Sequence, residues 1–169
     1  MKRLIVVPTQ KEVDLLLQGF NKLGLQAEAA SLGRLPVVQF DDLGVAVAKG
    51  GLGKVQFAIQ TQHLLDLSLN WDMAICAGAA GALVDGLSPG DIVVSTETIE
   101  HDILSKFSGK PLVPRFRAAE AAITALKDGL PVATSFQVHF GPIASGDEDV
   151  VSPERRREIH KLTGALAVA

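Results

Sequence analysis

The sequence predicts an α/β fold with a largely parallel sheet, and three observations support this class. Short, continuous apolar runs, such as 4–8 and 73–77, have the length and composition of buried strands. Other segments, such as 10–23, carry apolar residues at helical spacing. The two kinds of segment alternate along the chain, as in sheets whose strands are joined through helices. Such folds bind ligands beyond the carboxyl ends of their strands.

Each expected element has a local signal. Val13, Leu16, Leu17 and Phe20 share one face of the first helix. Ser152 and Pro153 form an N-cap and a first helical residue, so they open the last helix. Strands are expected at 4–8, 36–40, 43–48, 73–77, 91–98, 138–144 and 165–168, the second and third as a hairpin. Helices are expected at 10–23, 54–69, 115–127 and 153–162, with Val55, Ala58, Ile59, Gln62, Leu65 and Leu69 on one face of the second.

The composition indicates one domain over residues 1–169, because 47% of them are hydrophobic and can form a core. A net charge of −3 favours neither nucleic acid nor an anionic membrane as a partner. The apolar run at 73–84 is shorter than the ~18 residues of a membrane span. The single cysteine, Cys76, cannot form an internal disulfide and fits a reducing compartment. We therefore expect a soluble, cytoplasmic protein.

The segment Thr9-Gln10-Lys11-Glu12 carries the first candidate catalytic residue. Its spacing fits a capping box, with Thr9 as N-cap and Glu12 three residues later, and this structural role alone could explain Glu12. Glu12 also follows the carboxyl end of the first strand, where a carboxylate could orient or deprotonate a water molecule. The residues leave both roles open.

Two small-residue turns follow strand ends. The segment 49–54 is not a Walker A loop, because Ala48 and Val55 replace the first glycine and the Ser or Thr of that motif. It is not a GxGxxG motif either, because Gln56 occupies the position of the last glycine. Either Gly51 and Gly53 serve a turn with positive φ, or the backbone N–H groups there face a polar ligand. The turn at 77–82 contains only small residues, which allow close approach to a ligand or to another element. Its candidate binding residues are Gly78, Ala79, Ala80 and Gly81.

The remaining polar candidates are weaker. The loop at 145–149 could bind a cation or sugar hydroxyls through its three carboxylates, or it could be a solvated turn. His101 and Asp102 are neighbours on an expected strand and should point to opposite faces, so we expect a structural or interface role. Cys76 is expected in the core. The other histidines lack metal-ligand spacing, so no metal site is predicted.

These pieces, in this order, resemble the nucleoside phosphorylase/nucleosidase superfamily, and especially its methylthioadenosine/S-adenosylhomocysteine nucleosidase branch. The resemblance extends from the first residue to the last, and its motifs are specific for the superfamily but not for a substrate. The matching segments are Glu12-Val13, 51–55, 77–83, 89–95, His101-Asp102, 144–147 and 164–168.

The resemblance implies a twisted, mixed and partly barrel-like sheet ringed by helices, in a homodimer or larger homo-oligomer. It implies cleavage of the N-glycosidic bond of a purine nucleoside without a cofactor. Glu12 matches the acidic residue that activates water, and a carboxylate there also stabilises an oxocarbenium-like transition state. Gly51, Gly53 and the 78–81 turn would line the pocket. Ser145, Gly146 and Asp147 would lie beside the base.

The sequence departs from the family pattern in three places. It ends at Ala169, before the family's ribose-binding Met-Glu pair and its acidic Asp. Ala79 replaces a usual Ser or Thr, and Cys76 stands where phosphorylases carry Arg, so hydrolysis is favoured over phosphorolysis. Asp149 stands where the adenine-specific branch has an aromatic residue, and loss of that stacking surface puts adenine specificity in doubt.

The leading hypothesis is a purine nucleosidase acting on a methylthioadenosine/S-adenosylhomocysteine-like or futalosine-like substrate. The alternative is a truncated, catalytically impaired member that binds a nucleoside or only forms an oligomer. A purine nucleoside phosphorylase is a third possibility, and phosphate dependence would distinguish it.

Overall fold

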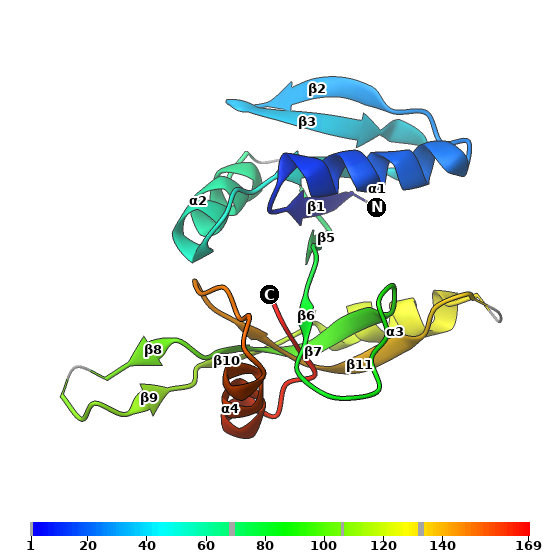
Figure 1. Ribbon diagram of the computed structural model, residues 1–169. Helices are drawn as coiled ribbons and strands as arrows, with labels where there is room; N and C mark the ends of the chain where they lie inside the picture. The colour runs from blue at the N-terminus through cyan, green and yellow to red at the C-terminus, as the bar shows by residue number, and fades with distance from the viewer. Residues whose placement is uncertain (1, 68–69, 106, 132–133) are drawn as a thin grey trace. The chain divides into compact units, whose positions relative to one another are not determined.

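A computed structural model of the chain describes residues 2–67, 70–105, 107–131 and 134–169, and Figure 1 shows its helices and strands. The chain folds as two compact units, Met1–Ala79 and Ala80–Ala169. Each unit contains a five-stranded mixed sheet with helices packed against it, so the expected α/β class is confirmed. The single domain over residues 1–169 and the barrel-like curvature stay predictions.

The N-terminal unit is built on a sheet with strand order β2-β3-β4-β1-β5. β1 runs parallel to β4 and β5, whereas β3 runs antiparallel to β2 and β4. The elements of this unit are β1 (Arg3–Val7), α1 (Gln10–Lys22), β2 (Glu28–Leu32), β3 (Leu35–Phe40), a 3-10 turn (Asp41–Leu43), β4 (Val45–Lys49), α2 (Lys54–Leu65) and β5 (Met73–Cys76).

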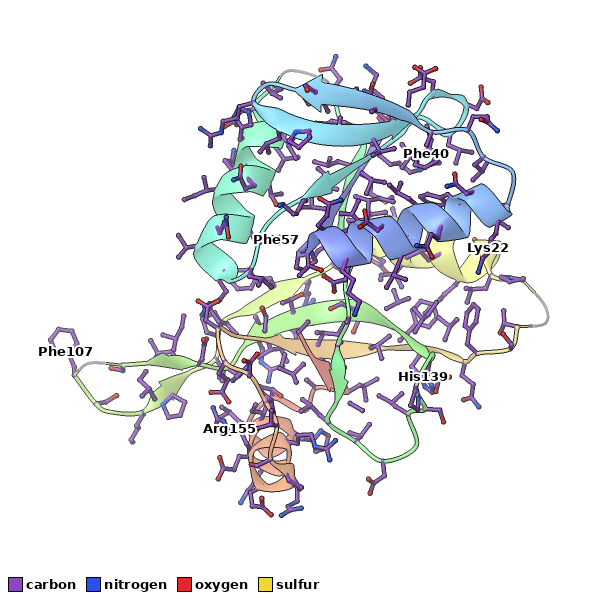
Figure 2. The ribbon with its side chains drawn as sticks, turned by 45° about the horizontal axis from the view of Figure 1, so that its top comes forward. Lys22, Phe40, Phe57, Phe107, His139 and Arg155 are labelled. Atoms are coloured by element: carbon purple, nitrogen blue, oxygen red, sulfur yellow. The ribbon has the colours of Figure 1, made fainter. Side chains whose placement is uncertain are left out.

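Side chains of β1 alternate between two hydrophobic clusters, as strand geometry requires. Leu4 and Val6 pack with Leu64 of α2, whereas Val7 packs with Val13 of α1 and with Phe40. α1 and α2 therefore contribute to clusters on opposite faces of the sheet. Figure 2 shows Phe40 of β3 and Phe57 of α2 within this unit. Because β1, β4 and β5 are parallel, the turns after them lie at one edge of the sheet.

The C-terminal unit has a second sheet with strand order β10-β7-β11-β12-β6. β11 runs parallel to β7 and β12, and β10 and β6 are antiparallel edge strands. α4 packs through Ile159 in a cluster with Ala144 and Val168. The elements are β6 (Gly81–Ala82), β7 (Ile92–Glu100), β8 (Ile103–Leu104), β9 (Pro111–Leu112), β10 (Arg115–Arg117), α3 (Glu120–Gly129), β11 (Val138–Ser145), α4 (Pro153–Thr163) and β12 (Ala167–Val168).

The helix expected at 115–127 is wrong at its start. Arg115–Arg117 forms strand β10, which pairs antiparallel with β7, and α3 begins only at Glu120. The pairing of Phe116 with Thr98 places this segment at the edge of the sheet, and that long-range contact outweighs the helical propensity of the alanines that follow. α2 ends at Leu65 rather than at 69, and residues 68–69 lie outside the described residues.

Candidate functional site

In the N-terminal unit, backbone hydrogen bonds join the turns at the carboxyl ends of three strands. Gly50 N donates to Val7 O over 2.8 Å and Gly51 N to Pro8 O over 3.0 Å, which ties the turn after β4 to the end of β1. Ala77 N donates to Val6 O over 3.0 Å, which ties the segment after β5 to the same strand. Residues from all three turns therefore lie close together.

Glu12 lies at this edge, in the first turn of α1, and its two carboxylate oxygens have different partners. Oε2 accepts hydrogen bonds from Thr9 N at 3.0 Å and from Thr9 Oγ1 at 2.6 Å, while Glu12 N donates to Thr9 Oγ1 at 3.2 Å. This is the expected capping box. Oε1 accepts from Ala79 N at 2.7 Å. The carboxylate therefore caps the helix and also contacts the turn that follows β5.

The surroundings of Glu12 lower the pKa of its carboxyl group. Burial is the largest single influence and raises the pKa, but the hydrogen bonds from Ala79 N–H, Thr9 Oγ1–H and Thr9 N–H together outweigh it. The net pKa lies below the ordinary value of 4.5. Glu12 is therefore an anion at neutral pH and is held in one orientation, as a general base requires.

Glycine is needed at three positions beside Glu12, either because the backbone has a positive φ or because a Cβ would be too close to neighbouring atoms. Gly51 and Gly53 have φ of 93° and 79°, so the expectation of a positive-φ turn is confirmed. A Cβ on Gly78 would lie 3.0 Å from Pro8 Cδ and 3.2 Å from Glu12 Oε1. The backbone of Gly78 therefore passes directly beside the carboxylate. Contact of these glycines with a ligand stays a prediction.

Cys76 departs from the expectation of a core residue. It ends β5, an edge strand of its sheet, and it is exposed. The pKa of its thiol is raised, first by partial desolvation and second by the charge of Glu12. The sequence pattern did not indicate that Cys76 lies near Glu12.

The C-terminal unit holds the second group of candidate residues, at the carboxyl ends of β7 and β11. His101 N donates to Ser145 O over 3.1 Å, and Asp147 N donates to Asp102 Oδ2 over 2.7 Å. β7 ends at Glu100, so the strand alternation used to assess His101 and Asp102 does not apply to them. Both side chains instead lie beside Gly146.

The candidate residues thus form two groups in the structure. Glu12, Gly51, Gly53, Gly78 and Ala79 belong to the N-terminal unit, with Ala79 N and the Gly78 backbone against Glu12. The other candidates, Ala80, Gly81, Ser145, Gly146 and Asp147, belong to the C-terminal unit.

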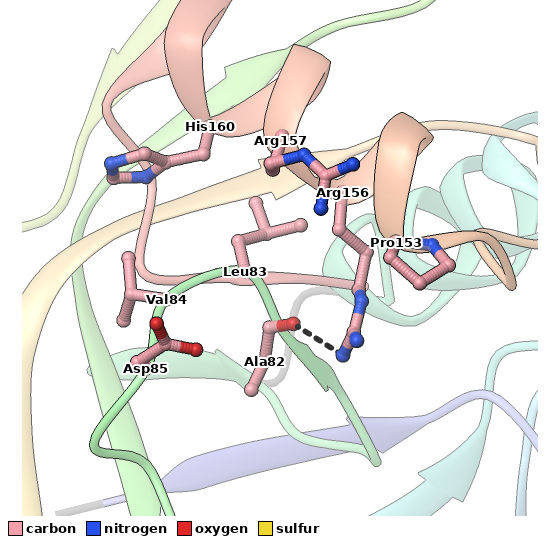
Figure 3. Close-up of a pocket in the computed structure, with 8 residues that line it drawn as sticks. All are labelled: Ala82, Leu83, Val84, Asp85, Pro153, Arg156, Arg157 and His160. Atoms are coloured by element: carbon pink, nitrogen blue, oxygen red, sulfur yellow. Dashed lines mark hydrogen bonds between the residues drawn. The ribbon is translucent and has the colours of Figure 1, made fainter.

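A cavity of about 350 Å³ in the C-terminal unit lies between the segment after β6 and α4 (Figure 3). It shares no residue with the candidate site. Arg156 Nη1 donates to Ala82 O over 3.5 Å, and Arg157 forms an ion pair with Glu154 at 2.9 Å. Asp85 adds a negative charge to the lining, so the cavity shows no consistent preference for an anion.

Within the described ranges, no group of three or more His, Cys, Asp and Glu side chains is arranged to hold a metal ion. None of the helices described combines the length and the hydropathy needed to cross a bilayer.

Comparison with known proteins identifies the family. The sequence pattern of the phosphorylase superfamily matches residues 2–169. The chain belongs to the phosphorylase superfamily. The matched range covers nearly the whole chain, as the resemblance of the sequence indicated.

Individual members of the superfamily agree with this assignment. The 5'-methylthioadenosine/S-adenosylhomocysteine nucleosidase of Geobacillus kaustophilus is 31% identical over 166 residues, which cover 92% of this chain and 67% of that protein. The crystal structure of the Neisseria meningitidis enzyme of the same name, in complex with methylthio-immucillin-A, has a TM-score of 0.80 and 31% identity. The match covers 99% of this chain and 75% of that one. A futalosine hydrolase mutant of Helicobacter pylori, at 24% identity and a TM-score of 0.79 over 99% of this chain and 77% of its own, shares the fold.

Proposed function

We propose that the protein is a nucleosidase that hydrolyses the N-glycosidic bond of a purine nucleoside. The observation that carries the proposal is the Glu12 carboxylate, ionised and oriented by Thr9 and Ala79 N–H at the carboxyl edge of the N-terminal sheet. Family membership and the names of the similar nucleosidases support the same reaction class. The leading substrate candidates resemble methylthioadenosine, S-adenosylhomocysteine or futalosine.

In the proposed reaction, Glu12 accepts a proton from a water molecule whose oxygen forms a bond to the anomeric carbon. The bond between that carbon and the base nitrogen breaks, and its electron pair leaves with the base. The negative charge of Glu12 also stabilises the positive charge that develops on the sugar. The departing base takes up a proton from solvent.

The other candidate residues would bind the substrate. Gly51, Gly53 and the 78–81 turn would allow its sugar to approach the backbone near Glu12. Ser145, Gly146 and Asp147 would lie beside the base. Asp149 is exposed and offers no stacking surface, which is why the identity of the base is left to experiment.

The decisive assay is release of the free base, measured by chromatography. The purified chain is incubated with methylthioadenosine, S-adenosylhomocysteine, adenosine, inosine and futalosine, each with and without phosphate. We expect phosphate-independent release from at least one substrate. Release that requires phosphate would indicate a phosphorylase. No release from any substrate would contradict the proposal and favour a nucleoside-binding or oligomeric protein.

The pH dependence of hydrolysis tests the role of Glu12 as the base. A carboxylate accepts a proton only in its ionised form, and the pKa of Glu12 is lowered. Activity that depends on it should persist at neutral pH and decline as the pH falls through that lowered pKa. The acid limb of kcat/KM, which reports the free protein, should therefore lie below pH 4.5. Circular dichroism over the same range separates this from acid unfolding, and a limb well above pH 4.5 would contradict the assignment.

We also propose that the protein forms a homodimer or a larger homo-oligomer. Leu52, Val55 and Ile59 place apolar side chains along α2 and its preceding turn, with exposed fractions of 70%, 70% and 54%. Val55 and Ile59 lie four residues apart on α2 and so share one face of the helix. In Figure 2, Phe107 extends from the tip of the β8–β9 hairpin. Exposed apolar stripes of this kind are typical of surfaces that associate.

Sedimentation of the wild-type chain should show a dimer or a larger species, and Ile59→Asp should shift it toward the monomer because a charge would enter the apolar contact. Lys11→Asp, at an exposed position on α1, is the matched control and should leave the assembly unchanged. A wild-type monomer at tens of micromolar would contradict self-association.

A further inference from the structure

We propose that Asp102 is a positioning residue that holds the 145–148 loop in the conformation that receives the base. The inference rests on the proposed function for the role of that loop. The contact itself is defined by the structure of the C-terminal unit alone, and it can therefore be measured whether or not the protein is a nucleosidase.

The first support is the hydrogen bond from Asp147 N to Asp102 Oδ2, at 2.7 Å. A charged acceptor makes this bond stronger than one between neutral groups. It joins residues 45 positions apart, from the segment after β7 to the loop after β11. A second bond in the same place, from His101 N to Ser145 O at 3.1 Å, fixes the beginning of the loop.

The second support is the close packing beneath Gly146. The His101 side chain is buried, with 3% of its surface exposed. A Cβ on Gly146 would lie 2.5 Å from His101 Nε2 and 3.1 Å from Asp102 Cγ. The absence of a side chain at Gly146 therefore lets the loop backbone lie directly on His101 and Asp102, and a shift of either residue would move the loop.

The far end of the loop has a different attachment. Arg155 of α4 binds both carboxylate oxygens of Glu148, at 2.6 and 2.9 Å (Figure 2 labels Arg155). This hydrogen bonding, more than any other influence, lowers the pKa of Glu148. The pair is more than one-third exposed on both sides, so solvent weakens it. Asp102 therefore holds the part of the loop that contains the predicted binding residues.

These contacts bear on substrate affinity more than on the chemical step. A loop that is already ordered loses less conformational entropy when a ligand binds. Glu12, which is proposed to activate the water, takes its orientation from Thr9 and from Ala79 N–H. Loss of the Asp102 contact should therefore raise KM and leave kcat nearly unchanged.

The experiment compares Asp102→Ala and Asp102→Asn with the wild type. Asn keeps an oxygen that can accept the Asp147 N–H, whereas Ala does not. We expect Asp102→Ala to raise KM by about tenfold or more, as loss of a bond to a charged group predicts, with kcat within about twofold. Asp102→Asn should restore most of the loss. Asp128→Ala, an exposed aspartate at the end of α3, is the matched control and should match the wild type.

Hydrogen exchange of the Asp147 amide, followed by NMR, gives a readout that needs no activity. Asp102→Ala should accelerate this exchange by about tenfold or more, and Asp102→Asn should do so less. Unchanged exchange, or unchanged KM beside lower stability, would overturn the inference. If the wild type releases no base, the proposed function fails while the exchange still decides whether Asp102 holds the loop. If Asp102→Ala does not fold, Gly146→Ala serves as the second variant, because its methyl group would crowd His101 and displace the loop. It should also raise KM, and an unchanged KM for Gly146→Ala would overturn the inference.

Discussion

Glu12→Gln is expected to lower kcat by about 10²–10⁴-fold, the usual contribution of a general base. Glutamine has nearly the same shape but cannot accept a proton from water at neutral pH, and it cannot supply negative charge to the developing oxocarbenium ion. It also has only one acceptor oxygen, so it cannot serve Thr9 and Ala79 N–H as the carboxylate does. The measurement is the initial rate of base release at saturating substrate.

Asp14→Asn is the matched control for this prediction. Asp14 lies on the same helix, is exposed, and accepts one hydrogen bond from Gln10 at 2.9 Å. It should retain the wild-type rate. Thermal unfolding of both variants separates chemistry from folding, since Glu12→Gln also weakens the capping box by about 1 kcal/mol. A folded Glu12→Gln protein with wild-type kcat would refute the assignment of Glu12 as the base.

Elements with strong local signals were predictable from the sequence. α1 begins directly after Thr9, as the capping box indicated, and α4 runs from Pro153 to Thr163 behind its Ser152 cap. β1 was recognisable because strands buried in a parallel sheet need unbroken apolar runs, as in Leu4–Val7. In each case the residues that determine the structure lie within one turn or one strand of each other.

Elements that depend on distant partners were not predictable. β2 has the sequence Glu-Ala-Ala-Ser-Leu, with little β propensity, and is a strand because it pairs with β3. β10 is a strand because it pairs with β7, against the expectation of a helix there. Strand pairing of this kind depends on tertiary contacts, so it cannot be predicted from a short segment of the sequence.

The same distinction applies to the candidate site. Glu12 could be found from the sequence, because a carboxylate just after a strand end is a local feature. Two groups near Glu12 could not be predicted from the sequence. They are the Ala79 N–H, which donates to Oε1, and the Cys76 thiol. The hydrogen bond from Asp147 N–H to Asp102 Oδ2 could not be predicted from the sequence either. Every residue except proline has a backbone N–H, so the residue type does not indicate which one donates to a carboxylate. Only the fold shows these contacts.

For α2, the sequence predicts which residues share an apolar face but not whether that face packs against the sheet or is exposed. The residues expected to share a face that lie within α2 do so by their spacing, but Val55 and Ile59 are exposed. Leu69, the last residue of that expected face, lies outside the described residues. The sheet instead receives Phe57 and Leu64. Apolar residues on both sides of this helix leave its orientation undetermined by periodicity alone.

Leu64→Ala is expected to destabilise the N-terminal unit by about 2–5 kcal/mol, because Leu64 is fully buried among Leu4, Val6 and Ala48 and its removal leaves a cavity. Leu65→Ala, the same change at a neighbouring side chain that is 39% exposed, should cost about 1 kcal/mol. Trp71, the only tryptophan, donates Nε1–H to Leu64 O over 3.0 Å, so its fluorescence reports unfolding of this unit in urea. Equal losses for the two variants would mean that Leu64 is not the residue that α2 buries against the sheet.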